Sequence, residues 1–338
     1  MDALPEFRVL SPATIDDVIA ARVAHPESKP LGGGTDLVVN IRRGIVAPPI
    51  LIDMNHVAEL HKIKADTGKL EIGASVRLSE LAENAGVIKH YPVLAQAAAH
   101  IAGPTHRNMG TVGGNLCLDT RCIFYNQSEW WRAANNHCLK TTGTVCHVAP
   151  KSRGVCFATF SGDLAPALLT LGAEVDIAGP RGRRTIPLNK LYIGFARQDV
   201  PVTETQGDGK IYLSLRPGEI VTGVRARNTP GLRSAYDKIR IRRSIEYPVA
   251  GVAVALKREG DRLTDLRIAF TGTNPRPVLL DGTQALCGRT LDERVFKGLD
   301  ALVRDQIMPM KTTFTPGHYR RRVAGVLARR LLARLFEN

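Results

Sequence analysis

The sequence of 338 residues has no long hydrophobic run, and only 5% of its residues are aromatic. No stretch approaches the roughly 20 consecutive apolar residues that a membrane-spanning helix needs. Residues 1–6 carry neither a basic start nor a hydrophobic segment, so we expect no signal peptide, no membrane association and a cytoplasmic protein. The 44% apolar and 23% charged residues are ordinary for a globular protein, and the length predicts more than one lobe.

Several motifs of well-characterised enzyme chemistry are also absent. The sequence contains no Gly-x-Ser-x-Gly or His-Glu-x-x-His motif and no carboxylate pair whose spacing indicates catalysis. It contains neither Gly-Lys-Ser/Thr after a glycine loop nor Gly-x-Gly-x-x-Gly. We therefore expect no catalytic side chain here. This absence is typical of a redox subunit in which bound cofactors carry the chemistry.

Acidic residues are scarce relative to basic ones, 32 against 46, which gives a net charge of +14. Such a surplus can attract nucleic acid, an anionic ligand or an acidic protein. Arg240, Arg242 and Arg243 alternate along an expected strand, and further arginines lie within the last expected helix. That helix lacks interleaved aromatic residues and any known docking motif for nucleic acid. We therefore favour an acidic protein partner or a subunit contact over nucleic acid.

Hydrophobic periodicity predicts regular structure over most of the chain. Ser11 followed by Pro12 indicates a helix that begins at residue 12. The polar residues 201–210 predict a surface loop, and the strands and helices after residue 225 predict a separate α+β lobe. The expected helices cover residues 12–24, 79–85, 94–101, 164–171, 292–304 and 317–335, and the expected strands cover residues 50–53, 69–74, 174–177, 236–243, 249–256 and 263–271.

Five of the six cysteines and both tryptophans lie within residues 117–160. This segment has few periodic apolar residues, whereas regular patterns resume on either side, so it resembles an insertion that a metal centre would stabilise. Zinc, an iron–sulfur cluster and unrelated reduced thiols are all open interpretations at this point. Zinc sites tend to pair cysteines two to four residues apart, and no Cys-x-x-Cys occurs. Trp130 and Trp131 could shield a metal centre or line an electron route, but we expect them to pack this segment against the core of the adjoining domain.

Two glycine-rich loops, at residues 32–36 and 110–115, interrupt the expected elements. Glycine allows the backbone to approach a ligand closely, and successive free amides bind anions. Each loop alone would be an ordinary turn. Together, Gly-Gly-Gly-Thr-Asp at residues 32–36 and Arg-Asn-Met-Gly-Thr-Val-Gly-Gly-Asn at residues 107–115 resemble the paired pyrophosphate loops of the FAD-binding subunits of molybdenum hydroxylases. That family includes xanthine dehydrogenase and carbon monoxide dehydrogenase.

Three later segments extend this resemblance over nearly the whole chain. Residues 161–169 resemble the segment whose aspartate contacts the ribityl chain, residues 215–220 the segment beside the isoalloxazine ring, and residues 235–238 the strand that carries a lysine. The FAD-binding residues that the resemblance implies are Leu31, Gly32, Gly33, Gly34, Thr35, Asp36, Leu37, Asn108, Gly110, Thr111, Val112, Gly113, Gly114, Asn115, Asp163, Leu215 and Lys238.

The resemblance also implies a fold of the α+β class. Residues 1–222 would form a two-part flavin-binding domain of the vanillyl-alcohol-oxidase (PCMH) type, with subdomains at 1–55 and 56–222. Residues 223–338 would form a C-terminal lobe of antiparallel sheet and helices, like that of carbon monoxide dehydrogenase flavoproteins. Residues 117–160 would be an iron–sulfur loop inserted into the first domain.

The sequence departs from most of the family before Asp163, which lies 48 residues after Asn115. This distance implies an insertion of about 40 residues, well beyond usual loop lengths. The flavin subunits of 4-hydroxybenzoyl-CoA reductases, one branch of the family, are similar here, because their extra loop carries a [4Fe–4S] cluster. The resemblance implies Cys122, Cys138, Cys146 and Cys156 as ligands. Cys117 is expected to be a bystander, and His137 and His147 to be neighbouring or surface groups.

The resemblance finally implies an electron-transfer role. The chain would belong to a dimer of heterotrimers, a heterohexamer, with a large molybdenum-cofactor subunit and a small [2Fe–2S] subunit. Reduced ferredoxin would supply electrons to the [4Fe–4S] cluster, and these would pass through FAD to the partner subunits, where 4-hydroxybenzoyl-CoA is dehydroxylated in anaerobic aromatic degradation. Two alternatives remain: an NAD-linked FAD subunit whose insertion is only structural, and a zinc-stabilised nucleic-acid-binding protein.

Overall fold

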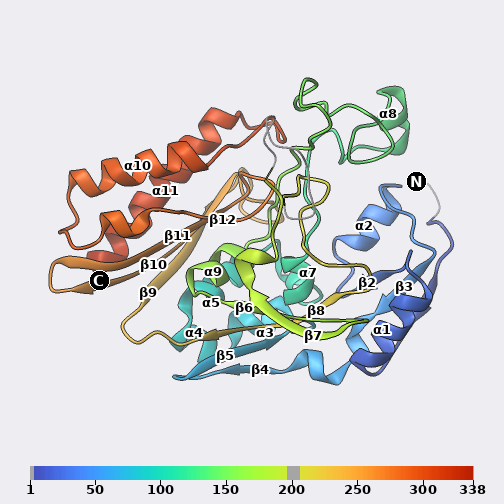
Figure 1. Ribbon diagram of the computed structural model, residues 1–338, viewed down its shortest axis with the longest axis horizontal. Helices are drawn as coiled ribbons and strands as arrows, with labels where there is room; N and C mark the ends of the chain where they lie inside the picture. Colours follow the sequence, from blue (N-terminus) through green and yellow to red (C-terminus); the bar gives the residue numbers. More distant parts are fainter. Residues whose placement is uncertain (1–3, 196–205, 338) are drawn as a thin grey trace.

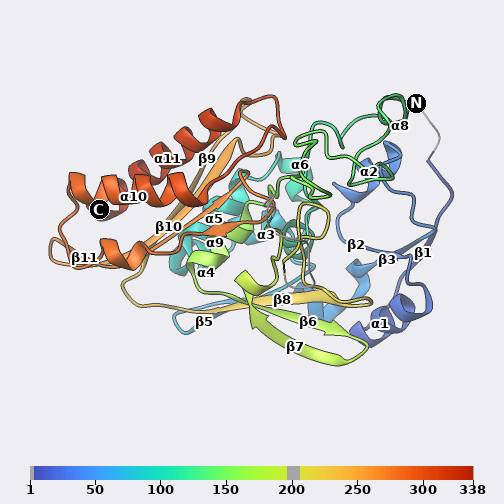
Figure 2. The same cartoon turned by 45° about the horizontal axis from the view of Figure 1, so that its top comes forward.

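The computed structural model describes residues 4–195 and 206–337. Within these residues, three β-sheets lie along the molecule with helices between and around them (Figure 1). The small N-terminal sheet and the C-terminal sheet lie at opposite ends, and the cysteine-rich segment lies beside α2 in both views (Figure 2). Among the described residues, no helix combines the length and hydrophobicity needed to cross a membrane.

The N-terminal sheet is parallel, with strand order β1-β3-β2. Its central strand is buried because three successive apolar residues, Ile50 to Ile52, face packed neighbours on both sides. The first helix begins at Ile15, because Thr14 accepts a hydrogen bond from the amide of Asp17 at 3.1 Å. The expected start at residue 12 is therefore wrong. The elements are β1 (Arg8–Leu10), α1 (Ile15–Ala24), β2 (Lys29–Leu31), α2 (Leu37–Arg42) and β3 (Ile50–Asp53).

The second sheet has five antiparallel strands in the order β4-β5-β8-β6-β7. One of its covering helices, α9, is buried at every position, because its sequence Leu-Ala-Pro-Ala-Leu-Leu-Thr offers small and aliphatic side chains to all sides. The elements are η1 (Met54–His56), η2 (Ala58–His61), β4 (Ile63–Ala65), β5 (Lys69–Gly73), α3 (Leu78–Glu83), α4 (Ala85–His90), α5 (Pro92–His100), α6 (Pro104–Arg107), α7 (Val112–Leu116), α9 (Leu164–Thr170), β6 (Glu174–Gly179), β7 (Gly182–Pro187), η3 (Leu188–Lys190) and β8 (Ile220–Arg227).

The third sheet, β12-β11-β10-β9, is antiparallel and covered on both faces. Helices α10 and α11 pack on one face (Figure 1). The other face packs against α5 and α9 of the lobe that holds the first two sheets, called here the flavin-type lobe after the resemblance described above. The sheet therefore joins the two lobes. The elements are β9 (Arg233–Ile239), β10 (Ala250–Glu259), β11 (Arg262–Thr271), β12 (Val278–Leu279), η4 (Thr283–Leu286), α10 (Glu293–Gln306) and α11 (Gly317–Glu337).

The arginines of α11 are not all surface groups. Arg320 is fully buried and donates hydrogen bonds to the carbonyls of Val249 and Met310 at 3.2 and 3.1 Å, and to that of Gly272. Burial lowers its pKa to about 10. This arginine therefore ties the start of α11 to the sheet, and part of the basic surplus is structural.

Residues 117–160, named here the insertion, are mostly irregular. Their regular element is α8 (Glu129–Ala134), and three non-glycine residues, Asn136, His137 and Arg153, have positive φ angles. Two small apolar clusters hold the insertion, and both are built around its cysteines. The expected core packing of the tryptophans is wrong for Trp130, which is 79% exposed.

Candidate cofactor sites

The two glycine loops lie against each other although about 75 residues separate them in sequence. A β-carbon built on Gly33 would lie 1.7 Å from the carbonyl oxygen of Met109, and one on Gly32 would lie 2.7 Å from Oγ1 of Thr111. Backbone approach this close is open only to glycine. The structure therefore brings the two sequence-predicted loops into one site, and the first loop needs its glycines for contact with the second.

The two loops differ in how many of their amides are available. In the described structure, the amides of Gly33, Gly34, Thr35 and Asp36 donate no hydrogen bond to another residue. In the second loop, by contrast, Gly110, Val112, Gly113 and Asn115 donate to backbone carbonyls, and Gly114 donates to Oγ1 of Thr111. The first loop therefore has successive amides that remain available to an anion.

Asp163 and Lys238, predicted separately from the sequence, form one buried ion pair. Lys238 Nζ lies 3.1 Å from Asp163 Oδ2, and both side chains are at most 5% exposed. The hydroxyl of Tyr236 donates to the other carboxylate oxygen, and the pKa of Tyr236 is raised by burial and by Asp163, so this hydroxyl stays a donor. Asn115 Oδ1 accepts from the amide of Leu164 at 3.0 Å. The second loop, Asp163 and Lys238 therefore belong to one connected site.

Leu215 lies apart from this network. It packs half-buried on the rim of the flavin-type core, and no hydrogen bond joins it to either loop among the described residues. The segment that follows it is fixed by Glu219, which accepts two hydrogen bonds from Arg184 at 2.9 and 2.7 Å. Burial raises the pKa of Glu219, but the bonds from Arg184 together with the amide and charge of Arg216 hold it below its usual value. Leu215 therefore remains a predicted contact.

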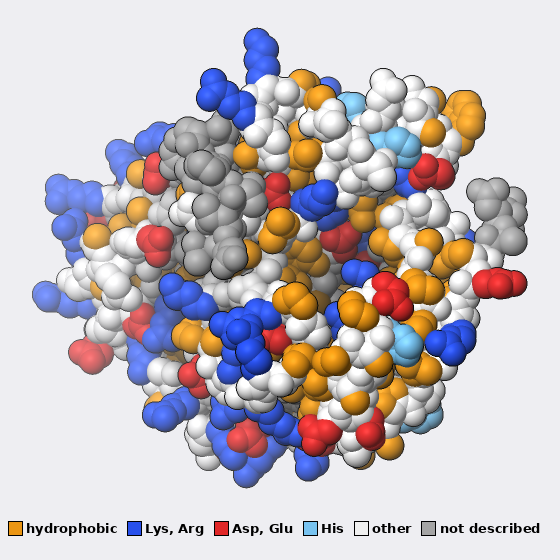
Figure 3. Space-filling view, turned by 45° about the vertical axis from the view of Figure 1, so that its right-hand side comes forward, with side chains coloured by type: hydrophobic (Ala, Val, Ile, Leu, Met, Phe, Trp, Pro, Cys, Tyr) orange, Lys and Arg blue, Asp and Glu red, His pale blue; other side chains and the backbone are white. Residues whose placement is uncertain are grey.

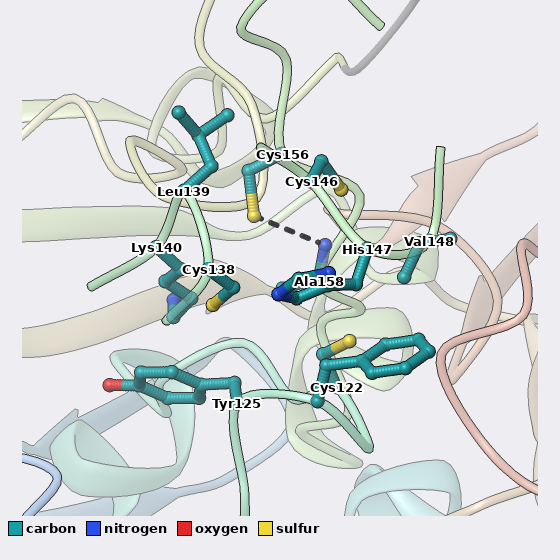
Figure 4. A pocket seen from close by; sticks show the side chains of 11 residues that line it. Cys122, Tyr125, Cys138, Leu139, Lys140, Cys146, His147, Val148, Cys156 and Ala158 are labelled. Atoms are coloured by element: carbon teal, nitrogen blue, oxygen red, sulfur yellow. Dashed lines mark hydrogen bonds between the residues drawn. The ribbon is translucent and has the colours of Figure 1, made fainter. Parts of the chain in front are cut away.

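The four predicted metal ligands line one pocket, although 15, 7 and 9 residues separate them in sequence. Cys122, Cys138, Cys146 and Cys156 are all buried, and Figure 4 shows their side chains with the ring of His147 among them. Few donors approach the sulfur atoms: the amide of Ala158 lies 3.5 Å from Sγ of Cys156. The remaining lining residues are Phe124, Tyr125, Leu139, Lys140, Val148 and Ala158.

Burial keeps two of these thiols, Cys122 and Cys156, protonated in the metal-free protein. It raises the pKa of Cys122 to about 11 and that of Cys156 to about 12. A metal centre must displace those protons, because the thiolate is the ligand. Among the described residues that line the pocket, Lys140 is the one Lys, Arg, Asp or Glu.

The pocket fits a four-thiolate centre in its chemistry but is contracted. About 10 Å³ of space remains in it, room for roughly one water molecule. No group of three or more His, Cys, Asp or Glu side chains is arranged to hold a single metal ion in residues 4–195 and 206–337. The structure therefore gives no support to a preformed zinc site, and a larger centre would require the side chains to separate.

Cys117 lies outside the pocket. It ends α7, and its carbonyl accepts a hydrogen bond from the hydroxyl of Tyr212 at 3.0 Å. Its sulfur faces the flavin-type core, and burial raises its pKa to about 12. Of the two histidines, His147 lines the pocket, whereas His137 lies 3.7 Å from Glu129 near the surface.

Three site residues were missed by sequence reasoning. Lys140 lines the thiol pocket and pairs with Asp119 at 2.8 Å, and Asp208 accepts a hydrogen bond from the amide of Cys156 at 2.8 Å. The expected surface loop 201–210 is therefore wrong for residues 207–209, which are buried against the insertion; residues 201–205 lie outside the described residues. Arg121, beside Cys122, contacts the first glycine loop. No local pattern could have revealed these contacts, because all depend on distant partners.

Comparison with known families assigns the chain. Residues 5–226 match the FAD binding domain in molybdopterin dehydrogenase, and residues 234–335 match the CO dehydrogenase flavoprotein C-terminal domain. The chain therefore belongs to the FAD-binding medium subunits of the molybdenum hydroxylase family, and the match supports FAD as its cofactor. A nucleic-acid-binding zinc protein is thereby set aside.

Individual relatives agree with this assignment. The aldehyde oxidoreductase FAD-binding subunit PaoB of Escherichia coli is 32% identical over 84% of this chain and 86% of its own length. The carbon monoxide dehydrogenase medium chain of Afipia carboxidovorans is 25% identical over 96% and 94%. Among solved structures, carbon monoxide dehydrogenase from Oligotropha carboxidovorans superposes with a TM-score of 0.78 at 22% identity, covering 99% of both chains. The fold is thus a mixed α/β FAD-binding domain with a C-terminal domain like that of these proteins.

Proposed function

We propose that the chain is the FAD- and [4Fe–4S]-carrying subunit of a molybdenum-dependent reductase of the 4-hydroxybenzoyl-CoA type. The observation that carries this proposal is the convergence of four cysteines from an irregular insertion into one buried pocket. The family assignment supplies FAD but not the cluster. The proposal also divides the chain into residues 1–222 and 223–338, with subdomains of the PCMH type at 1–55 and 56–222.

In this proposal the flavin lies where the predicted residues meet. The free amides of Gly33 to Asp36 bind the pyrophosphate, and the second loop shapes the opposite wall. Asp163 is held by Tyr236 and Lys238, so its carboxylate is oriented before a ribityl hydroxyl arrives. Leu215 contributes beside the ring. FAD when bound supplies two-electron chemistry, and these side chains only position it.

The thiol pocket would hold the cluster through Cys122, Cys138, Cys146 and Cys156. When bound, the cluster supplies a one-electron carrier next to the flavin. The apolar wall of the pocket would exclude water, and the buried ammonium group of Lys140 would offset part of the negative charge of four thiolates. Because the pocket is small, its lining side chains would have to separate to admit the cluster.

The proposed partners follow from the same assignment. A large molybdenum subunit and a small [2Fe–2S] subunit would complete a dimer of heterotrimers in the cytoplasm, and an acidic ferredoxin would donate electrons. On the face shown in Figure 3, Lys and Arg side chains are spread over the surface and outnumber acidic ones, which favours attraction of an acidic donor. Binding of nucleic acid is not part of the proposal.

Cofactor analysis tests the proposal directly. Anaerobically purified protein should contain one FAD, and about four irons and four acid-labile sulfides per chain, as a [4Fe–4S] centre requires. Protein that binds FAD fully but contains neither iron nor sulfide, even after anaerobic reconstitution, would reject the cluster and leave the FAD assignment intact.

The second candidate is an NAD-linked FAD subunit of a xanthine or carbon monoxide dehydrogenase-like hydroxylase, with a purely structural insertion. The relatives named carbon monoxide dehydrogenase and xanthine dehydrogenase favour it. Rapid reduction of the bound flavin by NADH in iron-free protein would support this candidate, whereas reduction by ferredoxin alone would support the first.

A further inference from the structure

We infer that Arg121 couples the insertion to flavin binding by holding Asp36 of the first glycine loop, so that FAD binding and closure of the thiol pocket reinforce each other. The inference deepens the proposed function and rests on it for one point, that the first glycine loop binds FAD. It concerns a positioning residue, since Arg121 acts through Asp36.

Arg121 lies at the neck of the insertion, next to the predicted ligand Cys122. Its backbone exchanges two hydrogen bonds of 2.7 Å with Thr159, which close the neck. Neighbouring contacts tie this neck to the C-terminal lobe, because Ile123 donates to the carbonyl of Thr312 at 2.9 Å. The backbone of Arg121 is therefore in place only when the two ends of the insertion are paired.

The side chain of Arg121 leaves the insertion and reaches the first glycine loop. Its guanidinium, only 9% exposed, forms an ion pair with Asp36 and donates to Oδ1 of Asn40 at 3.0 Å. It also donates to Oδ1 of Asn126, within the insertion, at 3.3 Å. Asn40 in turn donates to the second carboxylate oxygen of Asp36 at 3.0 Å. Asp36 closes the loop whose amides are free and immediately precedes α2. The position of that loop thus depends on Arg121.

Tyr247 of the C-terminal lobe completes the contact. Its hydroxyl donates to Asp36 at 3.2 Å, and the guanidinium of Arg121 lies 5.5 Å from the centre of its ring. Three segments that are distant in sequence therefore meet at one carboxylate. Nε of the guanidinium has no partner among the described residues, so Arg121 keeps capacity for one more acceptor.

These contacts predict a thermodynamic coupling. If FAD stabilises the position of Asp36, it stabilises Arg121 and the closed neck, and the insertion should open less often. By linkage, a well-ordered insertion must raise the affinity for FAD by the same factor. A lysine at position 121 keeps the charge but loses the planar fork that binds Asp36 and Asn40 together, so it should restore only part of the coupling.

The test measures opening of the thiol pocket in the full-length chain, with and without saturating FAD. In iron-loaded protein the readout is the rate of iron release to a chelator, and in iron-free protein it is the rate of alkylation of the buried cysteines. FAD should slow either rate at least fivefold in the unmodified protein, by less than twofold in Arg121→Met, and to an intermediate degree in Arg121→Lys.

Arg132→Met is the matched control. Arg132 is also a buried arginine of the insertion, but it bonds to the carbonyls of Gln127 and Gly44 rather than to Asp36, so the effect of FAD should persist. An equal effect of FAD in Arg121→Met, or none in the unmodified protein, would overturn the inference. Absence of iron would reject only the proposed cluster, because the alkylation readout does not need iron.

Discussion

Cys117 and the four pocket cysteines differ in what surrounds their sulfur atoms. Cys117 packs against the flavin-type core at the end of α7, whereas the others line one pocket. Serine is a poorer iron ligand than thiolate, so Cys122→Ser, Cys138→Ser, Cys146→Ser and Cys156→Ser should each lose most of the iron and make the insertion protease-sensitive.

Cys117→Ser should keep the iron and broad visible absorbance, with at most a small change in flavin absorbance. Cys287→Ser, in the C-terminal lobe, is a second cysteine control with no expected effect. Iron analysis and limited proteolysis of the six variants check this prediction. Loss of the cluster in Cys117→Ser, together with its retention in one of the four pocket variants, would show that the predicted ligand set is wrong.

The raised thiol pKa values predict a pH dependence of stability. Burial raises the pKa of Cys122 to about 11 and the pKa of Cys156 and of Cys117 to about 12 in the metal-free protein, against 9.0 ordinarily. Above pH 9 the folded state therefore binds more protons than the unfolded state, and the free energy of unfolding should fall by about 1.4 kcal/mol per pH unit for each thiol. Below pH 9 the contribution is fully present.

Denaturant titrations of iron-free protein at pH 8 and pH 10 measure this slope. Cys156→Ser should remove about a third of it, because Cys122 and Cys117 keep their shares and the hydroxyl does not titrate in this range. Iron-loaded protein should keep only the share of Cys117, since ligated thiolates carry no proton to lose. A slope that Cys156→Ser leaves unchanged would contradict the assignment of these protons to the pocket.

The two glycine loops differ in what an added side chain would meet. Sequence reasoning treats Gly33 and Gly114 alike, as positions where a side chain would block the flavin. In the structure a β-carbon on Gly33 would collide with the backbone of Met109, so Gly33→Val should damage the fold itself. A β-carbon on Gly114 meets only Oγ1 of Thr111, at 3.1 Å.

Gly114→Val should therefore give folded protein with at least tenfold weaker FAD binding, because the added methyl groups occupy the surface that the ligand approaches. Gly68→Val, on the turn between β4 and β5, is the matched control and should bind FAD normally, since its β-carbon meets only Asp66. Flavin content and thermal unfolding check both variants. Full flavin content in Gly114→Val would refute the placement of FAD at the second loop.

Local sequence predicted the elements with strong periodicity and missed those that depend on tertiary contacts. The strand at 50–53, the strands β10 and β11, and the helices α10 and α11 were predicted to within a few residues. The strand expected to reach residue 243 ends at Ile239, because the chain then turns away: Ser244 donates to the carbonyl of Ala102, and Tyr247 donates to Asp36 of the first glycine loop. Helix α7 has only five residues, two of them glycine, and forms because Thr111 caps it and two distant tyrosines bind its end.

For the molecule as a whole, sequence reasoning placed the sites but not the links between them. The glycine loops, Asp163, Lys238 and the four cysteines each carry a local signal, and the structure brings the first three together and the last four together. Arg121 and Lys140 carry none, because a lone basic residue in a polar loop is ordinary. Their roles appear only when distant segments fold against them.

The ion pair between Lys238 and Asp163 gives the whole-molecule prediction. Lys238 lies on β9 of the C-terminal sheet and Asp163 precedes α9, so the pair crosses between the two lobes. Lys238→Met leaves a buried carboxylate without its counter-ion, which should lower the free energy of unfolding by about 3–5 kcal/mol and reduce FAD content. Lys238→Met combined with Asp163→Asn removes both charges and should recover part of that stability.

An exposed pair provides the control for this cycle. Arg225 and Asp176 join β8 to β6 at the surface, and Arg225→Met should cost at most about 1 kcal/mol. Denaturant titrations of the single and double variants give the coupling energy directly. If Lys238→Met costs no more than Arg225→Met, or if adding Asp163→Asn only deepens the loss, then the pair does not hold the lobes together.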